Sequence, residues 1–353
     1  MEVDFLLVGQ GLAGTVLSHR LLALGQKVMV IDLPGGNQSS RIAAGLYNPI
    51  TGKKMVKSWN ADLLFPEIEP LYTELEELLG TTFLYKKNIY RPFLNIEEQN
   101  EWMGKTGDPG FEPYFEKIFS KELYSEVTNP FGGILLKNSG YVDINTLLTV
   151  YSGYLTKKNA LLEATFEEES LEIGKSGVSY KGISAKGIVY CNGLGAMKSR
   201  FFSNLPFAPV KGEILDIIQR FYPGEIINRG VFRITLPNGN QRVGSTYTWH
   251  DMDQGSTENA KNELLEKLEK LVPEEVSAIQ SHRFGIRPAT KDRKPFLGEH
   301  PDFPGVYIFN GFGAKGVSLI PYYSNTMVEM LLNGHQPEKE VNIARIKKHN
   351  SNF

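Results

Sequence analysis

Several features that mark particular protein classes are scarce in this sequence, and each scarcity excludes something. The 353 residues include one cysteine, Cys191, which excludes an intramolecular disulfide and any metal site with two or more cysteine ligands. A single thiol is typical of a reducing compartment, and we expect a cytoplasmic protein. No apolar run approaches the roughly 18 residues that a membrane span needs. The apolar N-terminal stretch lacks a basic region and a cleavage site, so we expect it to be a strand and not a signal peptide.

An excess of charge of one sign is also lacking. The chain has 38 basic and 40 acidic side chains, for a formal net charge of −2. Because phosphate binding uses clustered Lys and Arg, this balance argues against a protein built mainly to hold nucleic acid. Hydrophobic residues make up 41% and charged residues 22%, which excludes a largely disordered chain. The length predicts two domains, or one large fold with a second one inserted.

The N-terminal residues predict a βαβ unit. Residues 3–8 form an apolar run that stops at Gly9, and residues 27–32 form a second, β-branched run. Between them Leu and Val recur at helical spacing up to Gly25. A strand–helix–strand order within about 30 residues indicates a parallel sheet, so we predict an α/β fold.

Glycine is in excess, with 35 copies, and three of them form a G-x-G-x-x-G motif at the first strand-to-helix turn. The first glycine of such a motif allows a tight turn, the second lets the backbone approach a pyrophosphate, and the third allows close helix–strand packing. The motif reads Gly9-Gln10-Gly11-Leu12-Ala13-Gly14, and Asp32 ends the second strand 18 residues later. That acid is placed to accept hydrogen bonds from a ribose hydroxyl pair. The motif therefore predicts a dinucleotide site, and leaves NAD and FAD both open.

Farther along, the residue composition and the periodicity of the sequence change twice. Residues 83–135 are rich in aromatic residues, Pro and Gly, which indicates a different domain, and helical periodicity then returns. Residues 236–240, Leu-Pro-Asn-Gly-Asn, predict a hairpin turn. The patterns predict helices over 60–80, 144–158 and 257–271, the last capped by Thr257, and strands near 161–166, 170–173, 177–180 and 187–191.

Six further segments follow one another in a recognisable order. They are Ser39-Ser40-Arg41-Ile42-Ala43-Ala44-Gly45, Gly140-Tyr141-Val142-Asp143, Gly187-Ile188-Val189-Tyr190-Cys191-Asn192-Gly193, Pro209-Val210-Lys211-Gly212-Glu213, Gly285-Ile286-Arg287-Pro288 and Gly311-Phe312-Gly313-Ala314-Lys315-Gly316-Val317. Each is modest alone, but the ordered set, which spans nearly the whole chain, resembles the D-amino-acid oxidase and glycine oxidase superfamily of FAD-dependent oxidoreductases.

This resemblance implies the architecture and the cofactor. It implies a Rossmann-type FAD-binding domain built from residues 1–80, 140–205 and 285–353, with a second, antiparallel-sheet substrate domain from 81–139 and 206–284. It implies FAD, bound without a covalent link because Cys191 lies far from the attachment segment of relatives. The implied cofactor-binding residues are Gly9, Gly11, Leu12, Ala13, Gly14, Asp32, Ser40, Arg41, Ala43, Ala44, Gly45, Phe166, Gly193, Gly313, Ala314, Lys315, Gly316 and Val317.

The resemblance also implies the chemistry, namely oxidation of the C–N bond of an amino acid or related carboxylated amine by hydride transfer to the flavin N5. A carboxylate is best held by a planar cation with paired donors, which is Arg and not Lys. Arg287 matches the family's carboxylate-binding arginine in Gly-x-Arg-Pro, and a salt bridge to Asp292 is the alternative for it. Lys315 stands where many relatives have Arg, and could face the substrate carboxylate or the flavin.

Tyr247 is the third candidate catalytic residue. It falls where relatives supply pocket side chains from a central strand, and residues 245, 247 and 249 of such a strand would share one face. His250 is expected to be a solvated histidine at the strand end. Tyr47 and Asn48 could add polar groups to the pocket or could pack.

Three other functions stay open. A 2-hydroxy-acid dehydrogenase would need a base, normally His, and the C-terminal glycine turn offers none. The oxidase half of a bifunctional tRNA wobble-uridine modifier, which removes a carboxymethyl group from an amine, has a segment similar to Leu46-Tyr47-Asn48-Pro49, but the net charge and the absence of a methyltransferase region weigh against it. A protein that only holds FAD or relays electrons would not need the Arg287 and Lys315 pair. We expect a small-molecule substrate, no nucleic-acid partner and no membrane span, with either oxygen or a quinone as the electron acceptor.

Overall fold

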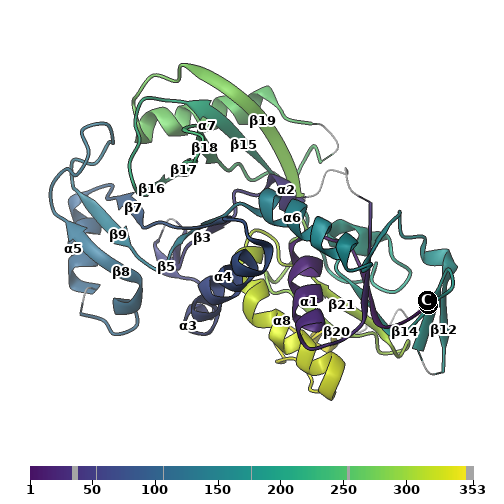
Figure 1. Ribbon diagram of the computed structural model, residues 1–353. Helices are drawn as coiled ribbons and strands as arrows, with labels where there is room; N and C mark the ends of the chain where they lie inside the picture. The colour runs from purple at the N-terminus through teal and green to yellow at the C-terminus, as the bar shows by residue number, and fades with distance from the viewer. Residues whose placement is uncertain (34–38, 53, 106, 176, 253–254, 347–353) are drawn as a thin grey trace, which may run out of the picture.

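Two large sheets dominate the computed structural model, which describes residues 1–33, 39–52, 54–105, 107–175, 177–252 and 255–346. Figure 1 shows one sheet at the lower right, beside α1 and α8, and the other at the upper left, with α2 and α6 lying between them. Helices α2 and α6 therefore lie at the junction of the two sheets.

The first sheet is the predicted parallel one. Its central strand β1 pairs in parallel with β2 and β14, β2 pairs in parallel with β11, and β14 pairs in parallel with β21. Antiparallel strands β12, β13 and β20 extend it. The bounds are β1 (Glu2–Val8), β2 (Val28–Asp32), β11 (Leu161–Glu163), β12 (Leu171–Gly174), β13 (Gly177–Tyr180), β14 (Ile183–Tyr190), β20 (Phe296–Glu299) and β21 (Val306–Asn310).

Both faces of β1 are buried, which explains its continuous apolar run. Phe5 and Leu7 point into a core shared with α1 (Leu12–Ala23) and α8 (Gly316–Asn333), whereas Leu6 and Val8 point into a second core. Because side chains alternate along a strand, the part of a strand that is covered on both faces is apolar at consecutive positions, here residues 5–8. The predicted βαβ unit and α/β class are confirmed.

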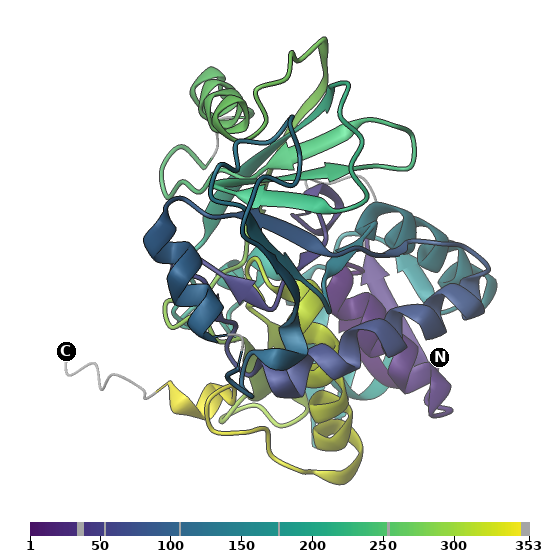
Figure 2. The ribbon, with the colours of Figure 1, turned by 90° about the vertical axis from the view of Figure 1, so that its left-hand side faces the viewer.

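Helices α1 and α8 lie side by side against this sheet (Figure 2). Pro321 lies inside α8 and lacks the N–H that a helix would donate to the carbonyl of Val317. The hydroxyl of the fully buried Tyr72 donates to that carbonyl instead, at 3.3 Å. Tyr72 lies in α4 (Ile68–Leu79), so a helix far away in sequence compensates for the proline.

Tyr72→Phe is expected to lower the free energy of unfolding by about 1–2 kcal/mol, because it leaves the Val317 carbonyl buried without a donor. Urea denaturation measures this change. Tyr154→Phe is the matched control, because its partly buried ring takes part in no described hydrogen bond, and its effect should stay within about 0.5 kcal/mol. Equal losses in the two variants would contradict the role given to Tyr72.

The second sheet has the strand order β19–β15–β18–β17–β16–β7–β9–β8. Neighbours are antiparallel except β16 and β7, which run parallel because the chain enters this sheet from two separate segments. Helix α7 (Glu258–Leu271), capped by Thr257 as predicted, covers one face. The bounds are β7 (Ile89–Pro92), β8 (Phe115–Phe119), β9 (Gly133–Leu136), β15 (Val210–Ile218), β16 (Ile226–Arg229), β17 (Val231–Thr235), β18 (Gln241–Gly244) and β19 (Ala278–Arg287).

Smaller elements complete the fold and correct three expectations. The helix expected over 60–80 is divided into α3, η1 and α4, because Pro66 cannot donate a helical hydrogen bond. The strand expected over 161–166 ends at Glu163, and an unexpected helix, α5, covers 96–105. The remaining bounds are α2 (Ser39–Ile42), α3 (Ala61–Leu64), η1 (Phe65–Glu67), α5 (Ile96–Lys105), α6 (Ile144–Lys157), β3 (Leu46–Tyr47), β4 (Ile50–Thr51), β5 (Val56–Lys57), β6 (Leu84–Lys86), β10 (Gly140–Val142), η2 (Glu112–Tyr114), η3 (Glu168–Ser170), η4 (Gly193–Lys198) and η5 (Ile343–Arg345).

The sequence contains a capping signal for helix α5 that was not among the predictions. The side-chain oxygen of Asn95 accepts from the backbone N–H of Glu98 at 2.9 Å, and the Glu98 carboxylate accepts from the N–H of Leu94 at 2.8 Å. An Asn followed three residues later by a Glu is a capping pair that marks a helix start.

Across the described ranges, no helix is both long enough and apolar enough to cross a membrane.

Candidate functional site

The glycine motif makes the tightest contact between α1 and the end of β1. A Cβ at position 14 would lie 1.9 Å from the carbonyl oxygen of Gly9, and Gly9 itself has a φ of +99°. A Cβ at position 9 would lie 2.8 Å from the Cα of Asn192. Two glycines are thus required before the helix can start this close to the sheet.

Helix α2 lies at the N-terminus of α1. The Ser40 hydroxyl accepts from the N–H of Leu12 at 3.3 Å, and a Cβ on Gly11 would lie 3.3 Å from the same oxygen. The first N–H groups of a helix have no partner inside it, so this turn presents donors and a positive dipole end to an anion. Arg41 points elsewhere, toward Asn145 and Thr149 on α6, at 3.1 and 3.0 Å.

A cavity of about 400 Å³ lies where β1 and β2 end. Its lining includes Gly9, Asp32 and Phe166, three residues that the sequence separates by up to 157 positions. The Phe166 ring follows β11 and packs edge-on against Tyr190 at 5.7 Å between centroids. Dinucleotides bind outside the carboxyl ends of parallel strands, and this cavity lies at that position.

Residues 43–45 continue from α2 toward the second sheet. Gly45 has a φ of +72°, and a Cβ there would lie 1.8 Å from the carbonyl oxygen of Val142. The N–H of Val142 donates to the Gly45 carbonyl at 3.0 Å. The glycine is therefore required by the protein's own packing, and Ala43 and Ala44 are held beside α2 by the same contact.

Tyr47 and Asn48 take packing and turn roles. The buried Tyr47 donates to Glu69 at 3.3 Å, and the side chain of Asn48 accepts from the N–H of Ile50 at 3.0 Å. Tyr47 lines a groove of about 890 Å³ with Phe65 and Tyr114. This groove is larger than the cavity at Asp32, but its lining holds none of the glycine motif and none of the candidate catalytic residues.

The start of α8 comes next to the start of α1. A Cβ on Gly316 would lie 3.6 Å from a methyl group of Leu12. The turn before it packs on the segment after β19, because Gly313 donates to the Pro288 carbonyl at 3.2 Å. Gly193 packs on the same segment, because a Cβ there would lie 3.8 Å from the Cγ of Pro288. The Gly193 carbonyl accepts from the Asn310 side chain at 2.9 Å. Ala314 and Val317 flank the same turn, so the second group of predicted cofactor residues gathers here.

Lys315 is the N-cap residue of α8. Its side chain keeps an exposed edge, and packing around the ammonium, together with the nearby Arg293 guanidinium, lowers the pKa of Lys315. Within the part of the chain that the structure describes, no carboxylate pairs with this lysine. The ammonium is thus available to an anion near the start of the helix.

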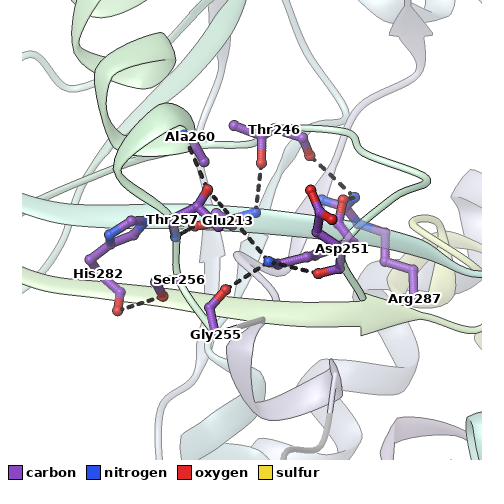
Figure 3. A network of polar contacts seen from close by, with 10 residues as sticks. Glu213, Thr246, Asp251, Gly255, Ser256, Thr257, Ala260, His282 and Arg287 are labelled. Carbon is purple, nitrogen blue, oxygen red and sulfur yellow. Dashed lines mark hydrogen bonds and ion pairs between the residues drawn. The ribbon is translucent and has the colours of Figure 1, made fainter. Parts of the chain in front are cut away.

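Arg287 ends β19 and is surrounded by neutral acceptors. Its guanidinium donates to the Ser245 hydroxyl at 2.8 Å. It also lies near the Thr246 carbonyl, at 3.4 Å (Figure 3). Burial lowers the pKa of Arg287, and no acidic side chain of the described residues forms an ion pair with it. Asp292, the alternative partner, is held by Arg345 at 2.8 Å. Because buried charges are normally paired, this guanidinium is a candidate binding site for an anion.

The ring of Tyr247 lies under this guanidinium, with 4.4 Å between the Arg287 Cζ and the ring centroid. The expectation that residues 245–250 belong to a strand was wrong: β18 ends at Gly244, and Thr248 forms an isolated bridge to Lys211. Ser245 and Tyr247 still contact Arg287, although Tyr247 is 57% exposed; Trp249 and His250 are exposed as well. Ser245 was not among the predicted site residues, and its only signal was its place in the alternating pattern.

Helix α2 links this arginine to the glycine turn. Gly285, two residues before Arg287, faces α2, and a Cβ there would lie 3.2 Å from the Cβ of Ile42 and 3.4 Å from the Cα of Ser39. The next residue of α2, Ser40, contacts Leu12. One short helix therefore touches both the dinucleotide cradle and the strand that ends in the cation.

Comparison with known proteins gives a family. Residues 4–330 match the family model described as "DAO: FAD dependent oxidoreductase". A glycine oxidase of Pseudomonas putida is 29% identical over 369 residues, covering 96% of both chains. A bifunctional protein for tRNA 5-methylaminomethyl-2-thiouridine biosynthesis, MnmC of Legionella pneumophila, is 21% identical over 91% of this chain, which spans 53% of that relative's length.

The fold, too, is similar to that of a glycine oxidase. The crystal structure of glycine oxidase from Geobacillus kaustophilus superposes with a TM-score of 0.78, at 21% identity, over 95% of this chain and 96% of that one. The fold described above is thus shared with that solved structure. The predicted fold class and family resemblance are confirmed.

Proposed function

This chain belongs to the FAD-dependent oxidoreductase (DAO) family, and from that premise we propose that it oxidises the C–N bond of an amino acid or a related carboxylated amine. It is an FAD-dependent oxidoreductase; the substrate class and the roles of individual residues are our proposal. The observation that carries it is Arg287, a half-buried guanidinium with neutral acceptors on one side, an aromatic ring on another and no acidic partner among the described residues.

The glycine turn, Asp32 and the start of α8 would hold FAD without a covalent bond. The contact between Gly9 and Gly14 sets the start of α1 close to the end of β1, where its N–H groups would bind the pyrophosphate, and the cavity at Asp32 and Phe166 would take the adenosine half. The Cys191 thiol is buried and burial raises its pKa, so it is unsuited to a covalent link. Bound FAD supplies the acceptor for the hydride.

Arg287 would bind the substrate carboxylate and so fix the position of the neighbouring C–H bond. A bidentate guanidinium–carboxylate pair restrains both distance and rotation, which a single ammonium does not. The Tyr247 ring supports the guanidinium from below, and Lys315 adds positive charge at the start of α8. Fixing a reacting bond in this way lowers the entropy cost of the reaction.

The alternative of 2-hydroxy-acid oxidation has less support. Removing hydride from an alcohol requires a base for the hydroxyl proton, whereas a neutral amine can donate hydride directly. Among the described residues, no histidine bonds to or stacks on Arg287, Tyr247 or Lys315; His282 pairs with Glu213 and His250 is exposed. The likeness to the tRNA-modifying protein keeps N-carboxymethyl amines in the panel of substrates to be tested.

Anaerobic reduction of the flavin by matched substrate pairs tests the proposal. Glycine and methylamine, sarcosine and dimethylamine, and 2-hydroxy acids are mixed with the holoenzyme, and loss of the flavin's visible absorption is followed. A carboxylated amine should reduce the flavin at least about 100-fold faster than its partner without a carboxylate, the effect of a lost charge pair. Faster reduction by 2-hydroxy acids, or equal rates within each pair, would contradict it, and reduction only by tRNA that carries carboxymethylaminomethyluridine would favour the tRNA-modifying function.

A further inference from the structure

We propose that the buried Lys211 and Glu213 form a positioning pair that keeps the segment around Tyr247 against Arg287, so that carboxylate binding depends on two charged residues that do not touch the substrate. The inference rests on the proposed role of Arg287. It concerns the Pro-Val-Lys-Gly-Glu segment, residues 209–213, for which the cofactor site offers no use.

The two charged side chains lie on the face of β15 opposite Arg287. A Cβ on Gly212 would lie 2.0 Å from the Arg287 Nη2, so the guanidinium crosses the sheet directly over this glycine. Because side chains alternate along a strand, Lys211 and Glu213 point the other way, toward α7. Their side chains are 0% and 2% exposed, with 3.4 Å between Nζ and Oε1.

Lys211 forms hydrogen bonds to the segment that follows β18, from both its side chain and its backbone. Its ammonium donates to the carbonyls of Gly255 at 2.7 Å and of Asp251 at 3.2 Å. Its backbone exchanges two hydrogen bonds with Thr248, at 2.9 and 3.0 Å. A buried ammonium with only apolar neighbours would be very costly, so these carbonyls are an integral part of its environment.

Glu213 forms hydrogen bonds to the same segment near both of its ends, at Thr246 and at Thr257 (Figure 3). Its carboxylate accepts from the N–H of Thr257 at 2.8 Å and from the Thr257 hydroxyl at 3.1 Å, and lies 2.8 Å from His282. Its backbone N–H donates to the Thr246 hydroxyl at 2.9 Å, and its carbonyl accepts from the Thr246 N–H at 3.2 Å. Thr257 also caps α7, so the carboxylate connects the segment to a helix.

The segment held in this way supplies the surroundings of Arg287. Ser245, Thr246 and Tyr247 provide the hydroxyl, the carbonyl and the ring that contact the guanidinium. Stability alone does not call for a buried ion pair, because an apolar pair of similar volume is often as stable. An apolar pair could not hold the carbonyls of residues 251 and 255, and this is what the geometry assigns to Lys211.

The test separates positioning from stability with three variants of the holoenzyme. Lys211→Met removes the donor and leaves the Glu213 charge without the ammonium. Lys211→Met combined with Glu213→Gln removes both charges and so restores most of the lost stability. Glu98→Gln is the control, because it breaks a partly buried ion pair with Arg229 on β16 of the same sheet, at 2.8 Å, away from residues 245–257. Acetate, with acetamide as the neutral control, is titrated against the flavin's visible absorption, and Tm and amine oxidation are measured for each.

Both Lys211 variants should bind acetate about tenfold more weakly and raise KM about as much, with kcat within about twofold of the unaltered protein, the effect of a coupled but non-contacting residue. The decisive result is that the double variant recovers Tm without recovering acetate binding. Acetate affinity that returns together with Tm, or that Glu98→Gln lowers equally, would overturn the positioning role while leaving Arg287 as the clamp. If the unaltered protein binds acetate no better than acetamide, both the positioning role and the proposed clamp fail.

Discussion

Gly14→Val is expected to reduce FAD affinity at least about 100-fold, because overpacking at a rigid backbone contact costs 1–3 kcal/mol or more. A Cβ at this position would lie 1.9 Å from the Gly9 carbonyl oxygen, a backbone atom that no side-chain rotation can move away. The start of α1 must therefore shift from the end of β1, and the N–H groups that face the pyrophosphate shift with it. Flavin content after purification and quenching of FAD fluorescence during titration measure the loss.

Gly153→Ala is the control for this variant. Gly153 lies within α6, its added Cβ would meet nothing within 4 Å, and its φ is not in the left-handed region. Alanine is favoured over glycine inside a helix by about 1 kcal/mol, so this variant should keep its FAD and be as stable or more so. If Gly14→Val binds FAD as well as Gly153→Ala does, the dinucleotide cradle is not where the motif predicts.

Arg287→Ala is expected to lower kcat/KM for a carboxylated amine by about 100- to 1000-fold, mainly through KM, with FAD still bound. Removing one member of a desolvated, hydrogen-bonded charge pair costs about 2–5 kcal/mol, and 100- to 1000-fold, about 2.7–4.1 kcal/mol, lies within that range. Arg287→Lys should recover only part of the loss, since a lysine makes no bidentate contact. Steady-state kinetics over a wide range of substrate concentration separate KM from kcat.

Two comparisons make the Arg287 result specific. Arg345→Ala removes a nearby arginine that pairs with Asp292, and it should change KM by no more than about twofold, as substitutions away from the binding site do. An amine without a carboxylate should react equally slowly with the unaltered protein and with Arg287→Ala. A loss of activity toward both kinds of amine, or a KM unchanged by Arg287→Ala, would show that the guanidinium does not hold the carboxylate.

The fold was predictable wherever its signal was local. The apolar run of β1, the spacing of α1 and the cap of α7 at Thr257 are all set by residues within a few positions of one another, and each appears in the structure as expected. Helix α5 was not predicted, because residues 83–135 were interpreted by their aromatic, Pro and Gly content. Asn95 and Glu98 nevertheless form a capping pair at its start. The break in the helix over 60–80 had an equally local cause in Pro66.

The candidate site was predictable only as separate pieces. The sequence by itself determined the glycine motif, the acid at its far end and an arginine in a Gly-x-Arg-Pro segment. Tertiary structure decided which residues surround that arginine, that Asp292 belongs to Arg345 and not to Arg287, and that Glu213 reaches Thr257 across 44 residues. The reason is physical: helix and strand periodicity depend on near neighbours, whereas the partner of a charge is whichever group the folded chain brings within about 4 Å.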